Sequence, residues 1–382
     1  QTLRKIITKT EHDPRLLTPG PLTTTARTKE AMLHDWGSRD QKFININKRV
    51  RERLLEIAGV SDTHECVPMQ GSGTFVVEAT LGTLLSRDGK TLVVINGAYG
   101  TRMTHMLDKM GRSYVTYETA ENEPPNPDDI DKLLTDDDAI DFVTIVHCET
   151  TAGILNPIEA VAQVIAKHKR NLIIDSMSAF GAIPLDPAQT PYAAIVFSAN
   201  KCFEGVPGLG FSIIRRDILE GAAGNAHSLS LDLHDQWKAL EAGGQYRFTP
   251  PVQVICAFEQ ALDQFDAEGG VAGRNKRYAD NCRILLDGLR EMGFKTLLSD
   301  NLQAPIIVSV HMPADPKFIF KDFYDAMEKK GFVLYPGKLT IADTFRVGCI
   351  GALDENDMNA ALSAMRQTLK DMGVKSGAPA RV

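Results

Sequence analysis

The sequence predicts an α/β fold, in which a large domain with a mostly parallel, doubly wound sheet precedes a smaller α+β domain. Two observations carry this prediction. Between about residues 65 and 260, apolar segments alternate with longer helical patterns, and several segments are almost continuously apolar. Strands covered by helices on both faces have this composition. After about residue 265 the pattern changes to one long helix followed by short strands and helices.

Six apolar segments of the first part are predicted strands, at 91–97, 113–118, 141–147, 171–176, 193–199 and 210–216. Helical patterns such as "IEAVAQVIAKHKR" (158–170) separate several of them, as in a parallel sheet with crossover helices. Only a tight turn separates the last two segments, so the strand at 210–216 can run antiparallel to its predecessor.

The second part begins with a predicted helix at 271–293. Short strands are expected at 304–312, 331–337 and 344–350, with helices near 316–330 and 354–373. We therefore predict a large domain over 16–265 and a small C-terminal domain over 266–382. Residues 1–15 are a candidate for packing on the small domain.

Composition and charge exclude several classes of function. The formal net charge of −7 gives no general attraction to nucleic acid or to an anionic membrane. No apolar stretch approaches the ~20 residues that span a bilayer, and the first residues lack the apolar core of a signal peptide. The six cysteines are scattered without a CxxC pair, and no HxxxH or HExxH pair indicates a metal site. We expect a cytoplasmic protein with reduced thiols and no metal.

Three groups at the carboxyl ends of predicted strands could carry chemistry, because ligands of open α/β sheets bind there. Lys201 follows the strand at 193–199, Asp175 ends the strand at 171–176, and Tyr99 follows the strand at 91–97. Each has a purely structural alternative: a lysine whose amine reaches solvent, a helix-capping carboxylate, or an aromatic side chain that fills the core. A partly desolvated lysine has a lowered pKa, which suits a nucleophile.

A glycine-rich turn supplies a fourth group. In "QGSGT" (70–74), Ser72, Gly73 and Thr74 begin a helical pattern, so exposed N–H groups and the helix dipole can bind a phosphate. Alone, this turn is more often a simple helix cap. Together with Lys201 and Asp175 it suits pyridoxal 5′-phosphate, whose aldehyde, pyridine nitrogen and phosphate match the three groups.

The same stretches carry a family resemblance. "LLTPGPLTT" (16–24), "NGAYG" (96–100), "HCETTAGILNPI" (147–158), "SANKCFEGVPG" (198–208), "SLSLDLHDQW" (228–237), "FTPP" (248–251) and "YPGK" (335–338) occur in family order. On these motifs the chain resembles the class V aminotransferases of fold type I, most closely the branch that uses 2-aminoethylphosphonate and pyruvate. The resemblance covers roughly residues 15–370.

The resemblance implies a role for each matching position. Lys201 would bind the cofactor covalently, Asp175 would keep the pyridine nitrogen protonated, and Tyr99 would stack on the ring. The other cofactor contacts implied are Ser72, Gly73, Thr74, Asn200 and Thr151 or its neighbour Thr150, with Tyr246 and Thr249 donated by the second subunit of a homodimer. Arg346 and Gly20 would lie on the substrate side.

The implied reaction transfers the amino group of 2-aminoethylphosphonate to pyruvate, giving phosphonoacetaldehyde and alanine. Other class V aminotransferases, which use alanine or serine with glyoxylate, are an alternative. A lyase or desulfurase is disfavoured because "YPGKLTIADTFR" (335–346) lacks a cysteine before Arg346, and we interpret Cys202 and Cys349 as buried packing thiols. A nucleotide-binding oxidoreductase is disfavoured because "GVPGLG" (205–210) joins two strands.

Overall fold

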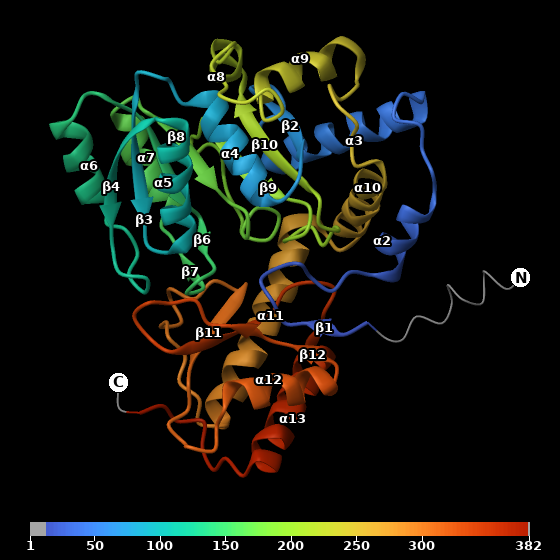
Figure 1. Cartoon of the computed structure of the whole chain (residues 1–382), viewed down its shortest axis with the longest axis vertical. Helices are drawn as coiled ribbons and strands as arrows, with labels where there is room; N and C mark the ends of the chain where they lie inside the picture. The colour runs from blue at the N-terminus through green and yellow to red at the C-terminus, as the bar shows by residue number, and fades with distance from the viewer. Residues whose placement is uncertain (1–12, 381–382) are drawn as a thin grey trace, which may run out of the picture.

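A seven-stranded sheet forms the centre of the larger unit in the computed structural model, which describes residues 13–380 (Figure 1). The strand order is β2-β10-β9-β8-β5-β3-β4. Strand β10 runs antiparallel to both of its neighbours, β2 and β9, and all other neighbouring strands of this sheet pair in parallel. The strands are β2 (His64–Gln70), β3 (Lys90–Ile95), β4 (Ser113–Glu118), β5 (Ile140–Val146), β8 (Asn171–Asp175), β9 (Ala194–Ser198) and β10 (Leu209–Arg215). The predicted fold class and the antiparallel strand at 210–216 are confirmed.

One strand of this sheet, β2, was not among the predicted strands. Its sequence, "HECVPMQ", places Glu65 and Pro68 within the segment and so lacks a continuous apolar run. Proline cannot donate a hydrogen bond to a ladder and is found in edge strands. Because β2 lies at the edge of the sheet, beside β10 alone, Pro68 is tolerated there.

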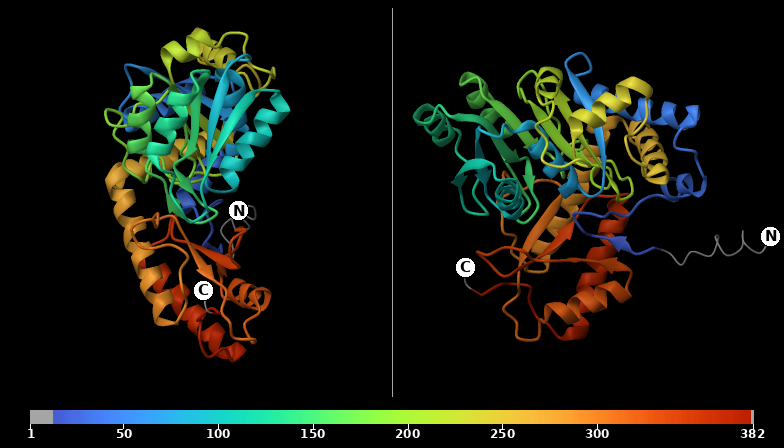
Figure 2. Two further views of the ribbon diagram at one scale, coloured as in Figure 1. Left: turned by 90° about the vertical axis from the view of Figure 1, so that its left-hand side faces the viewer. Right: turned by 45° about the horizontal axis from the view of Figure 1, so that its top comes forward.

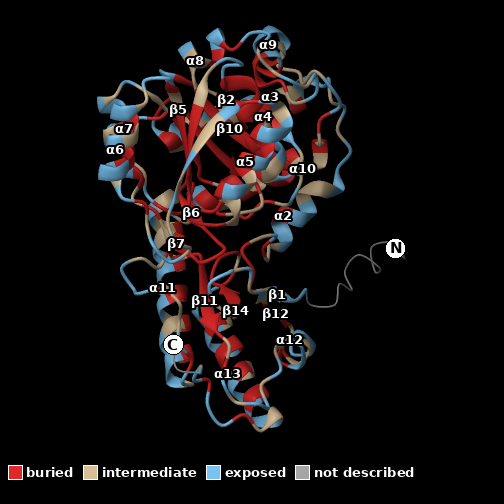
Figure 3. Cartoon of the chain, turned by 60° about the vertical axis from the view of Figure 1, so that its left-hand side comes forward, coloured by how far each residue is buried: buried red, intermediate tan, exposed pale blue. Residues whose placement is uncertain are grey.

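Helices cover both faces of the sheet, and the core lies between them and the strands (Figure 3). On one face, buried residues of α3 (Gln41–Ala58), α6 (Pro127–Asp136), α7 (Ile158–Lys167) and α10 (Val252–Ala267) pack against the strands. On the other face lie α4 (Gly73–Leu84), α5 (Ala98–Met110), α8 (Arg216–Gly221) and α9 (Leu233–Gly243). Short elements α2 (Ala26–Glu30), η1 (Ala31–Leu33), β6 (Cys148–Glu149) and β7 (Ile154–Leu155) lie in the connections.

The smaller unit follows the long helix α11 (Gly270–Glu291), which runs from the larger unit along the smaller one (Figure 2). Its three-stranded antiparallel sheet has the order β11-β14-β13, and helices pack beside it. The elements are β11 (Ile307–His311), α12 (Phe320–Lys329), β12 (Phe332–Val333), β13 (Tyr335–Pro336), β14 (Thr344–Gly348) and α13 (Glu355–Met372). A capping box formed by Asp354 and Asp357 begins α13.

The first described residues pack on this smaller unit. Strand β1 (Arg15–Leu16) pairs in parallel with β12, and Leu17 is fully buried in the hydrophobic core of the smaller unit. The segment around 15–17 therefore joins the C-terminal unit, although the predicted large domain begins at 16. Residues 1–12, for which the same packing was considered, lie outside the described residues. Within the described chain, no helix is both long and apolar enough to cross a bilayer.

Candidate active site

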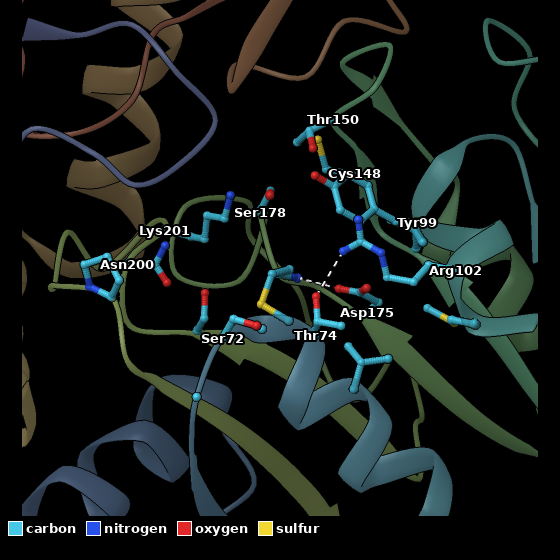
Figure 4. Close-up of a pocket in the computed structure, with 18 of the residues that line it drawn as sticks. Ser72, Thr74, Tyr99, Arg102, Cys148, Thr150, Asp175, Ser178, Asn200 and Lys201 are labelled. Atoms are coloured by element: carbon cyan, nitrogen blue, oxygen red, sulfur yellow. Dashed lines mark hydrogen bonds between the residues drawn. The ribbon is translucent and has the colours of Figure 1, made fainter. Parts of the chain in front are cut away.

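The strand order reverses between β3 and β5, and a cavity of about 540 Å3 opens beside the carboxyl ends of these strands. Such a switch point is where open α/β sheets bind their ligands. Figure 4 shows the cavity with side chains from both sides of the switch point. Its wall includes seven of the ten predicted cofactor residues: Ser72, Gly73, Thr74, Tyr99, Asp175, Asn200 and Lys201. Thr150, the alternative to Thr151, also lines it, whereas Thr151, Tyr246 and Thr249 do not.

Lys201 lies in the turn that follows β9, and its amine faces the N-terminal segment. Lys201 Nζ donates a hydrogen bond of 2.6 Å to the carbonyl oxygen of Pro19. Burial disfavours the charged amine and lowers the pKa of Lys201 to about 8. A neutral, nucleophilic amine is therefore far more abundant here than on an ordinary surface lysine.

Gly20 makes room for this amine. A Cβ atom added at Gly20 would lie 2.5 Å from Lys201 Nζ, and the φ of +134° at Gly20 is one that residues with side chains rarely adopt. The predicted substrate-side position of Gly20 thus lies directly beside the reactive lysine. Any larger residue there would displace the lysine side chain.

Asp175 ends β8 and is buried at the cavity wall. Its Oδ1 accepts a hydrogen bond of 3.0 Å from the Met177 N–H. Burial raises the pKa of Asp175 to about 6, although this hydrogen bond and the positive charges of Arg102 and Lys201 oppose the shift. A carboxylate in this position is stabilised by a cationic partner inside the cavity.

The glycine-rich turn opens the cavity on a third side. Ser72 is the N-cap residue of α4, but no side chain caps the first N–H groups of this helix in the described chain. These N–H groups and the helix dipole together form a site for an anion. Thr74 Oγ1 accepts a hydrogen bond of 3.0 Å from Arg102 Nη1, which is drawn as a dashed line in Figure 4.

A buried carboxylate that had no predicted role, Glu149, organises the loops after β3 and β5. It accepts hydrogen bonds from the Tyr99 N–H (3.1 Å), the Thr151 N–H (3.2 Å) and the Thr151 hydroxyl (2.7 Å). Thr151 is therefore directed towards Glu149, and it is the neighbouring Thr150 that lines the cavity. A Cβ added at Gly97 would lie 2.3 Å from Glu149 Cγ, so only glycine permits this close approach.

Arg346 reaches the site from β14 of the smaller unit. Its Nη1 donates to the carbonyl oxygen of Thr150 (2.8 Å) and its Nε to that of Pro336 (3.0 Å). The guanidinium also lies 4.7 Å from the centroid of the Tyr335 ring. The carbonyl of a cavity residue thus holds Arg346 close behind the wall, with its planar face supported by an aromatic ring.

Tyr246 and Thr249, which the resemblance assigns to the neighbouring subunit's site, do not line this cavity. Thr249 is exposed, and Tyr246 lies in a separate depression beside Phe75 and Phe248. The Tyr246 hydroxyl is buried and finds no hydrogen-bond partner among the described residues.

Two cations near Tyr99 were missed by sequence reasoning. The Arg102 guanidinium lies 4.8 Å from the centroid of the Tyr99 ring, and Lys338 Nζ lies 5.6 Å from it. In Figure 4 Arg102 lies between Tyr99 and Asp175. The only sequence signal for Arg102 was its position one helical turn after Tyr99, where side chains of a helix face the same way. Lys338 falls inside the "YPGK" motif but had no assigned role.

The six cysteines are all buried. Burial raises the pKa of Cys202 to about 12, and it also raises the pKa of Cys349. Their interpretation as buried packing thiols is confirmed, and neither supplies the thiolate that a desulfurase requires.

Two solved aminotransferases have this fold. Ureidoglycine–glyoxylate aminotransferase from Bacillus subtilis superposes with a TM-score of 0.88 at 18% identity, covering 96% of this chain and 95% of that one. Pyridoxamine–pyruvate aminotransferase from Mesorhizobium loti gives 0.86 at 23% identity, with 96% of both chains covered. At these identities the likeness establishes the fold alone.

The family follows from the sequence comparisons. The family model of the class V aminotransferases matches residues 27–327, and this chain belongs to that family. A protein of Pseudomonas fluorescens named 2-aminoethylphosphonate–pyruvate transaminase is 52% identical over 95% of this chain and 98% of its own length. A protein of the same name from Pseudomonas aeruginosa is 50% identical over the same shares. The prediction of a class V aminotransferase is confirmed.

Proposed function

We propose that this protein transfers the amino group of 2-aminoethylphosphonate to pyruvate, producing phosphonoacetaldehyde and alanine. The observation that carries the proposal is the convergence of Lys201, Asp175 and the turn at 72–74 on one cavity. The substrates come from the names of relatives that are 50–52% identical over nearly the whole chain.

The cavity residues fit pyridoxal 5′-phosphate as cofactor. The uncapped start of α4 matches the phosphate, the buried carboxylate of Asp175 matches a protonated pyridine nitrogen, and the amine of Lys201 matches the aldehyde. Thr150 is the residue of the threonine pair that would contact the ring oxygen, because Thr151 is engaged by Glu149. The Arg102 side chain lies between Tyr99 and Asp175, so it would have to shift for the pyridine ring of the cofactor to stack on Tyr99.

When bound, pyridoxal 5′-phosphate would act as an electron sink for the carbon that loses its proton. The chain's own groups then perform binding and proton transfer. Lys201 Nζ would hold the cofactor and, once the substrate amine has replaced it, would take the proton from the amine-bearing carbon of the substrate and return it to the cofactor side. The pKa of about 8 leaves a usable neutral fraction of this amine near neutral pH. Asp175 keeps its positive partner protonated throughout.

Arg346 would bind the acidic end of each substrate in turn. A guanidinium can donate two parallel hydrogen bonds to a carboxylate or to a phosphonate. Since two of its donors already bind the Thr150 and Pro336 carbonyls, the remaining donors are oriented before a substrate arrives. We expect both half-reactions to depend on this arginine.

The experiment that tests the proposed function measures the two half-reactions separately on the cofactor-loaded protein. 2-Aminoethylphosphonate should convert the cofactor to its amine form, and pyruvate should restore the aldehyde form, each followed by visible absorbance. Serine and alanine as amino donors, and glyoxylate as acceptor, are the comparison. Faster conversion by serine or alanine than by 2-aminoethylphosphonate would instead assign the protein to the alanine/serine–glyoxylate group of the family.

A homodimer with shared sites is the second part of the proposal. Phe75, Leu229 and Phe248 are large apolar residues with 51%, 76% and 46% of their surface exposed, and Phe75 directly follows the turn at 72–74. Exposed apolar side chains gathered near a site are typical of a subunit interface. Such an interface would bring Tyr246 and Thr249 of one subunit towards the cofactor phosphate of the other.

The cytoplasmic location expected from the sequence stays a prediction.

Mixed dimers test this arrangement. A chain with Lys201→Ala and a chain with Tyr246→Ala and Thr249→Ala are each expected to be nearly inactive. If Tyr246 and Thr249 act across the interface, reassociating the two chains restores one of the two sites in each heterodimer. Because about half of the dimers in an equal mixture are heterodimers, about a quarter of the wild-type activity should return. Recovery of no activity, with heterodimers demonstrated by differential tags, would place these residues in their own subunit's site.

A further inference from the structure

The loop at 337–343, between β13 and β14 of the smaller unit, is attached to the larger unit by one carboxylate. Glu121 Oε2 accepts hydrogen bonds from the Thr340 N–H (2.8 Å), the Thr340 hydroxyl (3.1 Å) and the Ile341 N–H (3.2 Å). Glu121 lies in the connection between β4 and α6. Three donors on one oxygen fix both the position and the direction of the loop.

This attachment places Lys338 beside a residue of the cavity wall. Lys338 lies two residues before Thr340, and its Nζ is 5.6 Å from the centroid of the Tyr99 ring, a wall of the cavity. Lys338 is an exposed residue, and its amino group adds a cationic side chain beside this wall. Nothing in the proposed transfer chemistry requires this charge, since Lys201 already supplies the amine.

The charge does match a difference between the two proposed substrates. A phosphonate carries up to two negative charges near neutral pH, as a phosphate monoester does, whereas the carboxylate of pyruvate carries one. Arg346 can neutralise one charge in either case. A doubly charged group would leave one negative charge over. Arg102, the other cation beside Tyr99, donates a hydrogen bond to Thr74 and acts on the carboxylate of Asp175, whereas Lys338 has no hydrogen-bond or ion-pair partner among the described residues.

We propose that Lys338 is a specificity-determining residue, held in place by Glu121, which supplies the second positive charge for a phosphonate and is not needed for a carboxylate. This inference rests on the proposed function. The proposed role of Lys338 differs from that of Arg346, which would serve both half-reactions. The contact between Glu121 and the loop at 337–343 would then serve to position Lys338.

The test compares half-reactions of the cofactor-loaded protein with Lys338→Met, which keeps the length of the side chain without its charge. We expect the second-order rate constant of the half-reaction with 2-aminoethylphosphonate to fall about tenfold, equivalent to about 1.4 kcal/mol. The pyruvate half-reaction should stay within about twofold of wild type. Lys338→Arg, which keeps the charge, should retain most of the activity, whereas Arg346→Gln should impair both half-reactions.

A binding measurement gives a readout that does not depend on turnover. Propylphosphonate and butyrate lack the reacting amine and differ mainly in their acidic group, so calorimetry can compare their affinities for the cofactor-loaded protein. Lys338→Met should weaken propylphosphonate about tenfold and leave butyrate unchanged. Glu121→Ala should weaken propylphosphonate to a smaller extent, whereas Glu123→Ala, the matched loss of an exposed carboxylate two residues away, should not.

Equal losses for phosphonate and carboxylate, or no loss for either, would overturn the role of Lys338. Failure of the wild-type protein to react with 2-aminoethylphosphonate would overturn the proposed function instead. In that case the comparison of propylphosphonate with butyrate still decides whether Lys338 distinguishes the two acidic groups.

Discussion

Replacing Lys201 with Ala is expected to lower turnover by more than about a thousandfold and to remove the visible absorbance of the lysine-bound cofactor. The physical reason is that Lys201 would supply both the covalent attachment and the proton transfer in the proposed mechanism, and no second lysine lines the cavity in the described chain. Absorbance spectroscopy of the purified protein and steady-state assays measure the two effects. A Lys201→Ala protein with normal multiple turnover would exclude the assigned role.

The pH dependence of cofactor attachment follows from the same residue. Because burial lowers the pKa of Lys201 to about 8, the neutral amine becomes the main form only above that pH. The rate at which cofactor-free protein binds pyridoxal 5′-phosphate covalently should therefore rise through about pH 8 and then level off. The midpoint of this profile should lie about two pH units below that of an ordinary lysine. Stopped-flow absorbance over that range provides the measurement, and Lys370→Met, at an exposed lysine of α13 outside the cavity lining, is the control that should keep the same profile.

Replacing Asp175 with Asn is expected to lower activity about a hundredfold or more. An amide of the same shape cannot hold a positive charge on a pyridine nitrogen, and the loss of one partner of a buried charge pair costs several kcal/mol. Cofactor affinity should fall as well, which equilibrium dialysis can measure. Asp175→Glu keeps the charge but lengthens the side chain and should retain more activity than Asp175→Asn.

Although Asp175→Asn should lower activity, it should raise the stability of the cofactor-free protein. The folded-state pKa of Asp175 is raised to about 6, so an ionised Asp175 is disfavoured in the fold. Between about pH 4 and 6 the folded chain holds a proton that the unfolded chain releases, and the wild-type protein loses stability as the pH rises through this range. Above about pH 6, Asp175→Asn should be more stable by up to about 3 kcal/mol, and below about pH 4 this gain should vanish. Urea unfolding at several pH values measures it; a destabilised variant at about pH 8 would contradict this account.

The ends of the buried strands could be predicted from the sequence because such strands are almost continuous apolar runs. Lys201 and Asp175 each interrupt or end an apolar run, so a polar group in that place needed an explanation, and both line the cavity. Strand β2 lacked this signal because Pro68 and Glu65 break the run, and its edge position was not visible from composition.

Other site residues could not be assigned because their roles depend on contacts across the fold. Whether Thr150 or Thr151 faces the cavity was decided by Glu149, which takes both donors of Thr151. Arg102 and Lys338 were indistinguishable from solvated surface cations until both were found beside Tyr99. Tyr246 and Thr249 lie away from the cavity of their own chain, and their roles remain proposals.

Arg346 belongs to the smaller unit, whereas Lys201, Asp175 and the turn at 72–74 belong to the larger one. The reach between the reacting amine and the acid-binding guanidinium is therefore set by how the two units are seated against each other. Altering contacts between the two units, such as the attachment of the loop at 337–343 to Glu121, should change the preferred length of the donor molecule. Directed evolution towards longer or shorter amino donors should accordingly select substitutions at the contacts between the two units as readily as substitutions around the cofactor.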